Sequence, residues 1–193
     1  TGYLYGKMNH IDIRNYGSGN SGTTNALRVL GKKAGLIVFA GDFLKTVFAC
    51  LAARIIFKAS PDTDLYVLYA GLGVVLGHNF PCYLHFKGGK GIASMAGILV
   101  SMDWRVTLVC AALFLGAVII TRYVSLGSIL VVISFFIQML IYGSRGDYRV
   151  SEVSVMEFFA ISFMLMAMAI WRHRANIKRL LSGTENKLWG GKK

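Results

Sequence analysis

Two glycine-rich stretches and one basic segment hold the residues best suited to bind an anion. The first stretch is GSGNSGTTNALRVLGKK, residues 17–33, in which small hydroxyl and amide side chains surround three glycines and Arg28 follows. Glycines leave backbone N–H groups accessible, and a run of such groups forms a concave anion-binding nest. A flexible polar loop is the alternative, but it would need neither two asparagines nor an arginine at the start of a helical pattern.

The second stretch is GHNFPCYLHFKGGKGIASMAG, residues 77–97. Lys87 and Lys90 flank two glycines, and an apolar helix is expected to begin at Ile92. Glycines, lysines and a helix N-terminus together favour a second anion site. Two lysines that snorkel to the membrane interface are the alternative, and the pattern does not rank one lysine above the other.

The third segment is RHRANIKRLLSGTE, residues 172–185, which we expect to continue the preceding helix. His173 and Asn176 are three residues apart and therefore share a helix face. Gly183 suits a helix C-terminus. A basic flank that only orients the protein in a membrane would explain the arginines, but it would not explain Asn176.

Several other functions are excluded. Gly17 to Gly22 fits the dinucleotide pattern G-x-G-x-x-G, but no alternation of strands and helices surrounds it. Lys90 is followed by Gly91, not by the Ser or Thr of a P-loop. The chain has no soluble basic domain of the kind that binds nucleic acids. Asp12 and Glu185 are the only carboxylates of the three segments, so we expect no metal and no cofactor.

The elements that must position these segments are membrane helices. The chain has 193 residues, of which 55% are hydrophobic and 16% charged, with a net charge of +12. A spanning helix needs about 20 apolar residues, so the shorter runs must borrow polar residues or stop part-way across. We predict an all-α integral membrane protein, a polytopic helical bundle forming one domain over residues 1–193. The apolar runs cover residues 35–57, 65–80, 92–102, 106–121, 123–144 and 153–171.

Charge is distributed unevenly between the two sides of this bundle. If the connections alternate in side, most of the 21 Lys and Arg residues fall on one side, which the positive-inside rule makes cytoplasmic. Segments 10–34, 78–91 and 172–185 all lie on that side. Within the first run, Asp42 and Lys45 share a helix face, and intramembrane charges usually pair. We predict a structural ion pair near the site, with a direct substrate contact as the alternative.

At these three motifs, and over essentially the whole chain, the sequence closely resembles the bacterial acyl-phosphate-dependent glycerol-3-phosphate acyltransferases of the membrane. The resemblance implies a seven-span enzyme, and we expect most of the first span to be missing here. It implies transfer of a fatty acyl group from acyl phosphate to the 1-hydroxyl of sn-glycerol 3-phosphate. The products would be lysophosphatidic acid and phosphate, in the first step of phospholipid synthesis. It also implies a multi-pass protein of the bacterial inner (cell) membrane with its active site on the cytoplasmic face.

The resemblance also implies site residues and partners. The expected partners are the lipid bilayer and the two substrates, with a transient contact to a cytosolic enzyme that makes acyl phosphate; a monomer is expected. The glycerol 3-phosphate residues would be Ser18, Arg28, Lys90, His173 and Asn176, of which Lys90, His173 and Asn176 are catalytic. The acyl phosphate residues would be Gly19, Asn20, Ser21, Gly22, Thr24 and Asn25.

Two questions stay open at the level of sequence. The general base is either His173 or a phosphate oxygen of a substrate, and the resemblance favours the substrate. Composition and topology alone also allow a transporter for an anionic metabolite, or a head-group transferase acting on lipid phosphates. The three motifs are what favour the acyltransferase.

Overall fold

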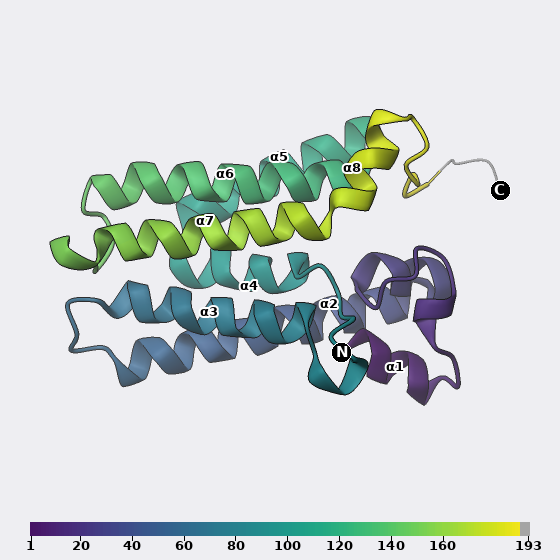
Figure 1. Cartoon of the computed structure of the whole chain (residues 1–193), viewed down its shortest axis with the longest axis horizontal. Coiled ribbons are helices and arrows are strands. Elements are labelled where there is room, and N and C mark those ends of the chain that lie inside the picture. The colour runs from purple at the N-terminus through teal and green to yellow at the C-terminus, as the bar shows by residue number, and fades with distance from the viewer. Residues whose placement is uncertain (190–193) are drawn as a thin grey trace.

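The computed structural model describes residues 1–189, and all regular structure within them is helical (Figure 1). The predicted all-α bundle is confirmed, and five of the helices are long and apolar enough to cross a membrane. Short 3₁₀ turns cover Ile13–Asn15, Cys82–Leu84 and Glu152–Ser154. The α-helices are α1 (Gly2–Met8), α2 (Thr23–Ile56), α3 (Thr63–Asn79), α4 (Ile92–Met102), α5 (Trp104–Thr121), α6 (Val124–Ser144), α7 (Val155–Arg172) and α8 (Arg174–Leu181).

Helix α4 is the short helix at the centre of the bundle. Its 11 residues rise only about 16 Å, roughly half the apolar thickness of a bilayer, so it stops part-way across. It packs against α2, α3 and α5. A Cβ on Gly97 would lie 2.7 Å from Thr46 Cβ, and one on Gly71 would lie 2.7 Å from Ile98. Small residues therefore let α2, α3 and α4 approach closely, as they do between membrane helices generally.

The segments that contain the three motifs gather at one end of the bundle, the right-hand end of Figure 1. Ion pairs join the connections at the opposite end. There Asp64 pairs with Arg54 at 2.8 Å, and Arg105 pairs with Asp103 at 2.7 Å and with Asp147 at 2.9 Å. The arrangement matches the alternation of connections that the sequence predicts.

Helix α2 is broken at Gly31, which has φ 85° and ψ −177°. The first part of α2, residues 23–30, folds back on the second, because a Cβ on Gly35 would lie 2.8 Å from Leu27 Cβ. In one continuous helix, residues eight apart would be separated by about 12 Å. The break therefore turns Arg28, which lies on the first part, away from the axis of the spanning part.

The expected continuation of the last span into the third motif is wrong in detail. Helix α7 ends at Arg172, and α8 begins at Arg174 after a break at His173 (φ −96°, ψ 3°). The imidazole Nδ1 of His173 turns back to the carbonyl of Ala169 at 2.8 Å, so side chain and backbone share one acceptor. The predicted stop is confirmed, since Gly183 has φ 69° just beyond the end of α8.

We predict that Gly31→Ala destabilises the protein, because the backbone conformation of Gly31 is essentially restricted to glycine and costs another residue about 1–3 kcal/mol. The melting temperature in detergent should fall by several degrees. Gly73→Ala is the matched control, since Gly73 is helical and a Cβ there would meet no atom within 4 Å. An unchanged melting temperature for Gly31→Ala would show that the break can straighten without cost.

Candidate active site

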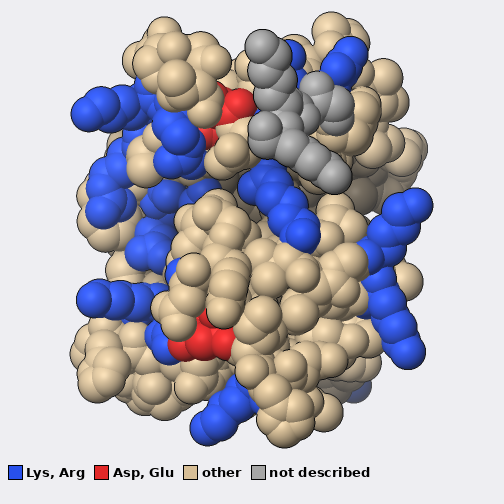
Figure 2. Space-filling model, turned by 90° about the vertical axis from the view of Figure 1, so that its right-hand side faces the viewer, with Lys and Arg blue, Asp and Glu red and all other residues tan. Residues whose placement is uncertain are grey.

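The three motif segments meet around one cavity of about 150 Å³. Lysine and arginine side chains surround this end of the molecule, with little acidic surface among them (Figure 2). Two of the predicted residues do not line the cavity: Gly19 lies on the surface, and the buried Ser21 lines a neighbouring cavity. The predicted residues that line it are Ser18, Asn20, Gly22, Thr24, Asn25, Arg28, Lys90, His173 and Asn176.

Asn25 shapes the first glycine-rich loop. Its Oδ1 accepts from the Ser18 N–H at 2.8 Å, and its Nδ2 donates to the Ile13 carbonyl at 2.8 Å. Asn20 closes the tip of the loop, where its Oδ1 accepts from the Gly22 N–H at 2.9 Å. The amide of Asn25 is therefore occupied by the loop itself, and this side chain acts as the loop's anchor.

Thr23, one of the hydroxyl side chains of the first glycine-rich stretch, also lines the cavity. Within residues 1–189 its buried Oγ1 has no hydrogen-bond partner, although it lines the cavity at the start of α2. A buried hydroxyl without a partner is costly, so the site is suited to a ligand that supplies an acceptor.

Lys90 is the lysine that enters the cavity, whereas Lys87 is exposed. Its Nζ donates to Asn176 Oδ1. Burial lowers the pKa of Lys90 to about 8, although the Glu185 carboxylate favours the charged form. Most molecules therefore keep a positive Lys90 at neutral pH, held in a poorly solvated place where it interacts strongly with an anion.

Glu185 joins these groups, and the sequence did not identify it as a site residue. Its Oε1 accepts from Asn176 Nδ2 at 2.8 Å and from Ser125 Oγ at 3.1 Å, and its Oε2 accepts from Arg179 Nε at 2.8 Å. Its position as the one acid of a basic motif was the available signal. Ser125 lies in an apolar run of α6 and gave no signal.

His173 is buried and neutral. Its Nδ1 lies 2.8 Å from the Ala169 carbonyl, which can only accept, so the proton sits on Nδ1 and Nε2 is an acceptor. Burial lowers the pKa of His173 to about 4, against the backbone hydrogen bond, which raises it. The imidazole therefore offers the cavity a lone pair at physiological pH.

The Asp42–Lys45 pair lies beside the cavity, as predicted, with Lys45 Nζ 2.7 Å from Asp42 Oδ1. His78 joins it, with Nδ1 3.3 Å from Asp42 Oδ1 and 3.1 Å from Lys45 Nζ. Among residues 1–189 no three His, Cys, Asp or Glu side chains come together as metal ligands.

Known proteins are similar to this chain in both sequence and fold. The sequence profile of the family described as glycerol-3-phosphate acyltransferase matches residues 1–183. The chain belongs to this family. A glycerol-3-phosphate acyltransferase from Thermoanaerobacter sp. strain X514 is 42% identical over 187 residues, which cover 96% of this chain and 87% of the relative. One from Clostridioides difficile strain 630 is also 42% identical, over 97% of this chain and 88% of the relative.

Solved structures of the family have the same fold. A crystal structure of PlsY (YgiH), an integral membrane glycerol 3-phosphate acyltransferase in its glycerol 3-phosphate form, superposes with a TM-score of 0.82 at 37% identity and covers 98% of this chain and 88% of that one. The lysophosphatidic acid form gives a TM-score of 0.81 at 36% identity, covering 96% and 86%. Like these family members, the chain is a multi-pass integral membrane protein.

We predict that acid destabilises the protein partly through His173. Between the ordinary histidine pKa near 6.5 and the folded value of about 4, the unfolded chain binds a proton that the folded protein does not. The free energy of unfolding should therefore fall, by at most about 3 kcal/mol, as the pH falls through this window.

The measurement is the melting temperature in detergent at pH 7 and pH 4.5. His173→Gln lacks the titration and should lose less stability than the parent, whereas His10→Asn, at an exposed position, should behave like the parent. Equal losses in all three proteins would mean that His173 is already protonated in the folded state.

Proposed function

We propose that this protein transfers a fatty acyl group from acyl phosphate to the 1-hydroxyl of sn-glycerol 3-phosphate, giving lysophosphatidic acid and phosphate. The observation that supports this most is the composition of the cavity, which is lined both by the cations Arg28 and Lys90 and by apolar side chains of four helices. A small anionic substrate and a lipid-like one can meet there. Membership of the family and the names of the solved relatives support the same substrate.

The cations address the main obstacle to this reaction. Both substrates contain a phosphate, so their charges repel when the hydroxyl approaches the carbonyl. Fixed cations and N–H donors neutralise that charge without having to reorganise during the reaction. Holding the two substrates together also removes translational and rotational entropy from the barrier.

Glycerol 3-phosphate is assigned to the side of the cavity that Lys90 and His173 form. Arg28 and Lys90 supply charge to its phosphate, and Asn176 holds Lys90 in place through its Oδ1. The neutral His173 accepts a hydrogen bond from a substrate hydroxyl and so orients the glycerol. Ser18, at the edge of the first loop, completes the group that we predict for this substrate.

Acyl phosphate is assigned to the first glycine-rich loop. Within the loop from Gly19 to Thr24, the N–H groups of Thr23 and Thr24 at the start of α2 would hold its phosphate, together with the Thr23 hydroxyl, which has no partner among residues 1–189. The N–H groups of Gly19 and Gly22 already donate to the Tyr16 carbonyl and to Asn20 Oδ1, so they shape the loop. Asn25 contributes by fixing the loop. The acyl tail would follow the apolar lining toward the lipid, over the N-terminal turn of α4. That lining consists of Phe39 of α2, Ile92 and Ala93 of α4, Phe114 of α5 and Val124 of α6.

The reaction is a displacement at an activated carbonyl. The 1-hydroxyl oxygen attacks the carbonyl carbon, the bond from that carbon to the bridging oxygen breaks, and phosphate leaves with that oxygen. The hydroxyl proton passes to a phosphate oxygen of a substrate, since phosphate monoesters have a second pKa near 6. His173 is the alternative base, since its Nε2 is an acceptor.

We infer the orientation from charge. The three motif segments lie at the same end of the bundle, and that end contains most of the lysines and arginines (Figures 1 and 2). By the positive-inside rule this end faces the cytoplasm of a bacterial inner membrane. The anionic substrates would then reach the cavity from the side on which they are made.

The first test supplies the purified protein in lipid with glycerol 3-phosphate and either palmitoyl phosphate or palmitoyl-CoA. We expect lysophosphatidic acid from palmitoyl phosphate. Lys90→Ala should lower kcat/KM by about 10²–10³-fold, the usual effect of losing a well-aimed donor. Lys87→Ala removes an exposed lysine of the same loop and should stay within about twofold of the parent.

Each alternative has its own result in this assay. Product from palmitoyl-CoA alone would overturn the donor and the leaving group. No product from either donor, together with uptake of glycerol 3-phosphate into vesicles, would favour a transporter.

The second test asks which group takes the proton. In His173→Gln we expect the KM for glycerol 3-phosphate to rise about tenfold or more, because the hydroxyl loses its acceptor. At saturating concentrations of both substrates, kcat should fall by less than about tenfold. General-base catalysis is typically worth 10²–10⁴-fold, so a loss of kcat in that range would identify His173 as the base.

A further inference from the structure

The position of Lys90 depends on the preceding glycine pair, which has no side chains that could fix its own conformation. Lys90 follows Gly88 and Gly89, and glycine has the largest conformational freedom of any residue. A lysine at the end of such a segment would sample many positions. The pair is nevertheless buried, so neighbouring groups must fix it.

The end of α3 supports one side of this segment. The Gly89 N–H donates to the His78 carbonyl, and the Gly88 N–H donates to the Asn79 carbonyl, both at 3.1 Å. The contact is close: a Cβ on Gly89 would lie 2.0 Å from His78 Nε2, and one on Gly88 would lie 2.1 Å from the His78 carbonyl oxygen. The glycine pair therefore lies directly on His78.

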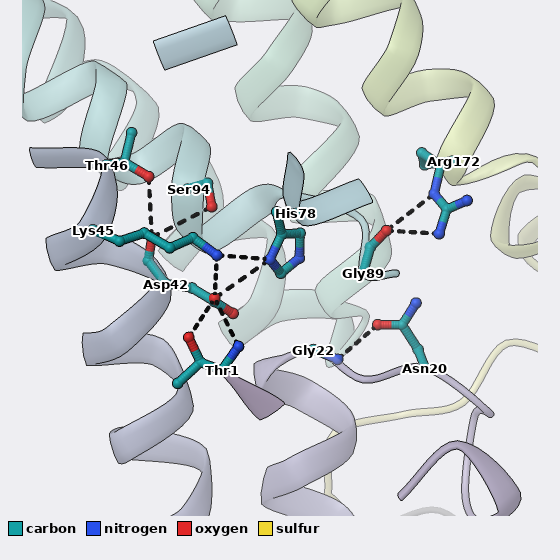
Figure 3. Close-up of polar contacts among 10 residues, drawn as sticks. All are labelled: Thr1, Asn20, Gly22, Asp42, Lys45, Thr46, His78, Gly89, Ser94 and Arg172. Atoms are coloured by element: carbon teal, nitrogen blue, oxygen red, sulfur yellow. Dashed lines mark hydrogen bonds and ion pairs between the residues drawn. The ribbon is translucent and has the colours of Figure 1, made fainter. Parts of the chain in front are cut away.

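The imidazole of His78 is itself held in place by Asp42 and Lys45 (Figure 3). Its Nδ1 lies 3.3 Å from Asp42 Oδ1 and 3.1 Å from Lys45 Nζ, and these two residues form an ion pair. Asp42 is fully buried, and its carbonyl accepts from Ser94 Oγ of α4 at 3.3 Å. The ring is thus fixed by groups anchored to both α2 and α4.

Arg172 holds the opposite side of the glycine pair. Its Nε donates to the Gly89 carbonyl at 3.0 Å, and its Nη2 donates to the Gly88 carbonyl at 2.6 Å. In Figure 3 Gly89 lies between His78 and Arg172. The N–H groups of the pair face α3 and its carbonyls face α7, so both sets of backbone groups are used.

We propose that His78, held by Asp42 and Lys45, is a positioning residue that fixes Gly88 and Gly89 and so determines where the Lys90 ammonium lies in the cavity. This rests on the function proposed above, in which Lys90 binds the phosphate of glycerol 3-phosphate. His78 also lines the cavity, but both of its ring nitrogens face protein groups. Its Nδ1 is paired with Asp42 and Lys45, and its Nε2 is covered by Gly89.

The kinetic test uses His78→Ala, Gly89→Ala and the double variant, assayed with glycerol 3-phosphate and palmitoyl phosphate. Each single variant should raise the KM for glycerol 3-phosphate by about 10–100-fold, since a misplacement of about 1 Å can cost about 10²-fold. The KM for palmitoyl phosphate should change by less than about threefold.

The double variant tests the contact itself. Removing the ring relieves the clash that the methyl group introduced by Gly89→Ala would make, so the combined effect should be smaller than the product of the two single effects. His85→Asn, at an exposed position of the same loop, is the control and should match the parent. Multiplicative effects, or equal rises in both KM values, would overturn the proposal.

A second readout needs no activity. Reductive methylation with formaldehyde and cyanoborohydride, followed by mass spectrometry, reports the fraction of free amine at Lys90, with the exposed Lys87 as internal reference. In the parent, labelling of Lys90 should be half-maximal near pH 8. In His78→Ala the lysine should reach solvent, and the midpoint should move toward the ordinary value near 10.4.

The two readouts separate the two ideas. A parent that makes no product but shows the shifted midpoint would refute the proposed function and leave the positioning role of His78 standing. An unchanged midpoint in a folded His78→Ala would overturn that role whatever the activity.

Discussion

Bringing several cations into one poorly solvated cavity costs free energy, and the Glu185 carboxylate offsets part of that cost. Arg179 pairs with it directly. Asn176 links it to Lys90, because the Asn176 amide donates to Glu185 and accepts from the Lys90 ammonium. Without this carboxylate, Asn176 would have no acceptor for its amide and the Lys90 ammonium would be less favourable where it lies. With this carboxylate present, the cavity still has an excess of positive charge, which a bound phosphate can neutralise. The balance is what keeps the cations together and still lets them bind an anion.

The same network explains why three segments that are far apart in the sequence surround one cavity. Lys90 reaches Asn176, Arg172 reaches Gly88 and Gly89, and Arg28 reaches the Asn186 carbonyl at 3.3 Å. Each of these contacts joins positions more than eighty residues apart. The glycines are useful because their backbone can be held entirely from outside. The flexible glycine pair thus takes a defined position once α3 and α7 pack on either side of it.

Much of the fold could be predicted from the sequence, because a membrane helix leaves a signal in every residue it contains. The apolar run 123–144, for example, differs from α6 by one residue at its start. The features that were missed depend on contacts between distant positions, which leave no periodic pattern. Glu185 is one acid among basic residues until the fold brings Asn176 and Ser125 to it.

Lys87 and Lys90 show the same limit of sequence-based prediction within a single loop. They flank two glycines almost symmetrically in the sequence, so local patterning gave no reason to prefer either. Burial separates them, because the chain turns Lys90 toward Asn176 and leaves Lys87 exposed. The break at Gly31 was also hidden, since a glycine within a helical pattern more often remains helical than takes φ 85°.

The short length of α4 connects the fold to the chemistry. Its C-terminal end is tied to the end of the bundle opposite the motif segments, because Asp103 follows it directly and pairs with Arg105, which also pairs with Asp147. A helix of about 16 Å that starts from that side ends well inside the apolar layer. The segment before α4 must therefore dip into the membrane to meet it, and its backbone groups must all be satisfied by protein, as His78 and Arg172 satisfy those of Gly88 and Gly89. In the proposed reaction this would bring Lys90 to a depth that the acyl chain also reaches, which a full-length helix would not provide.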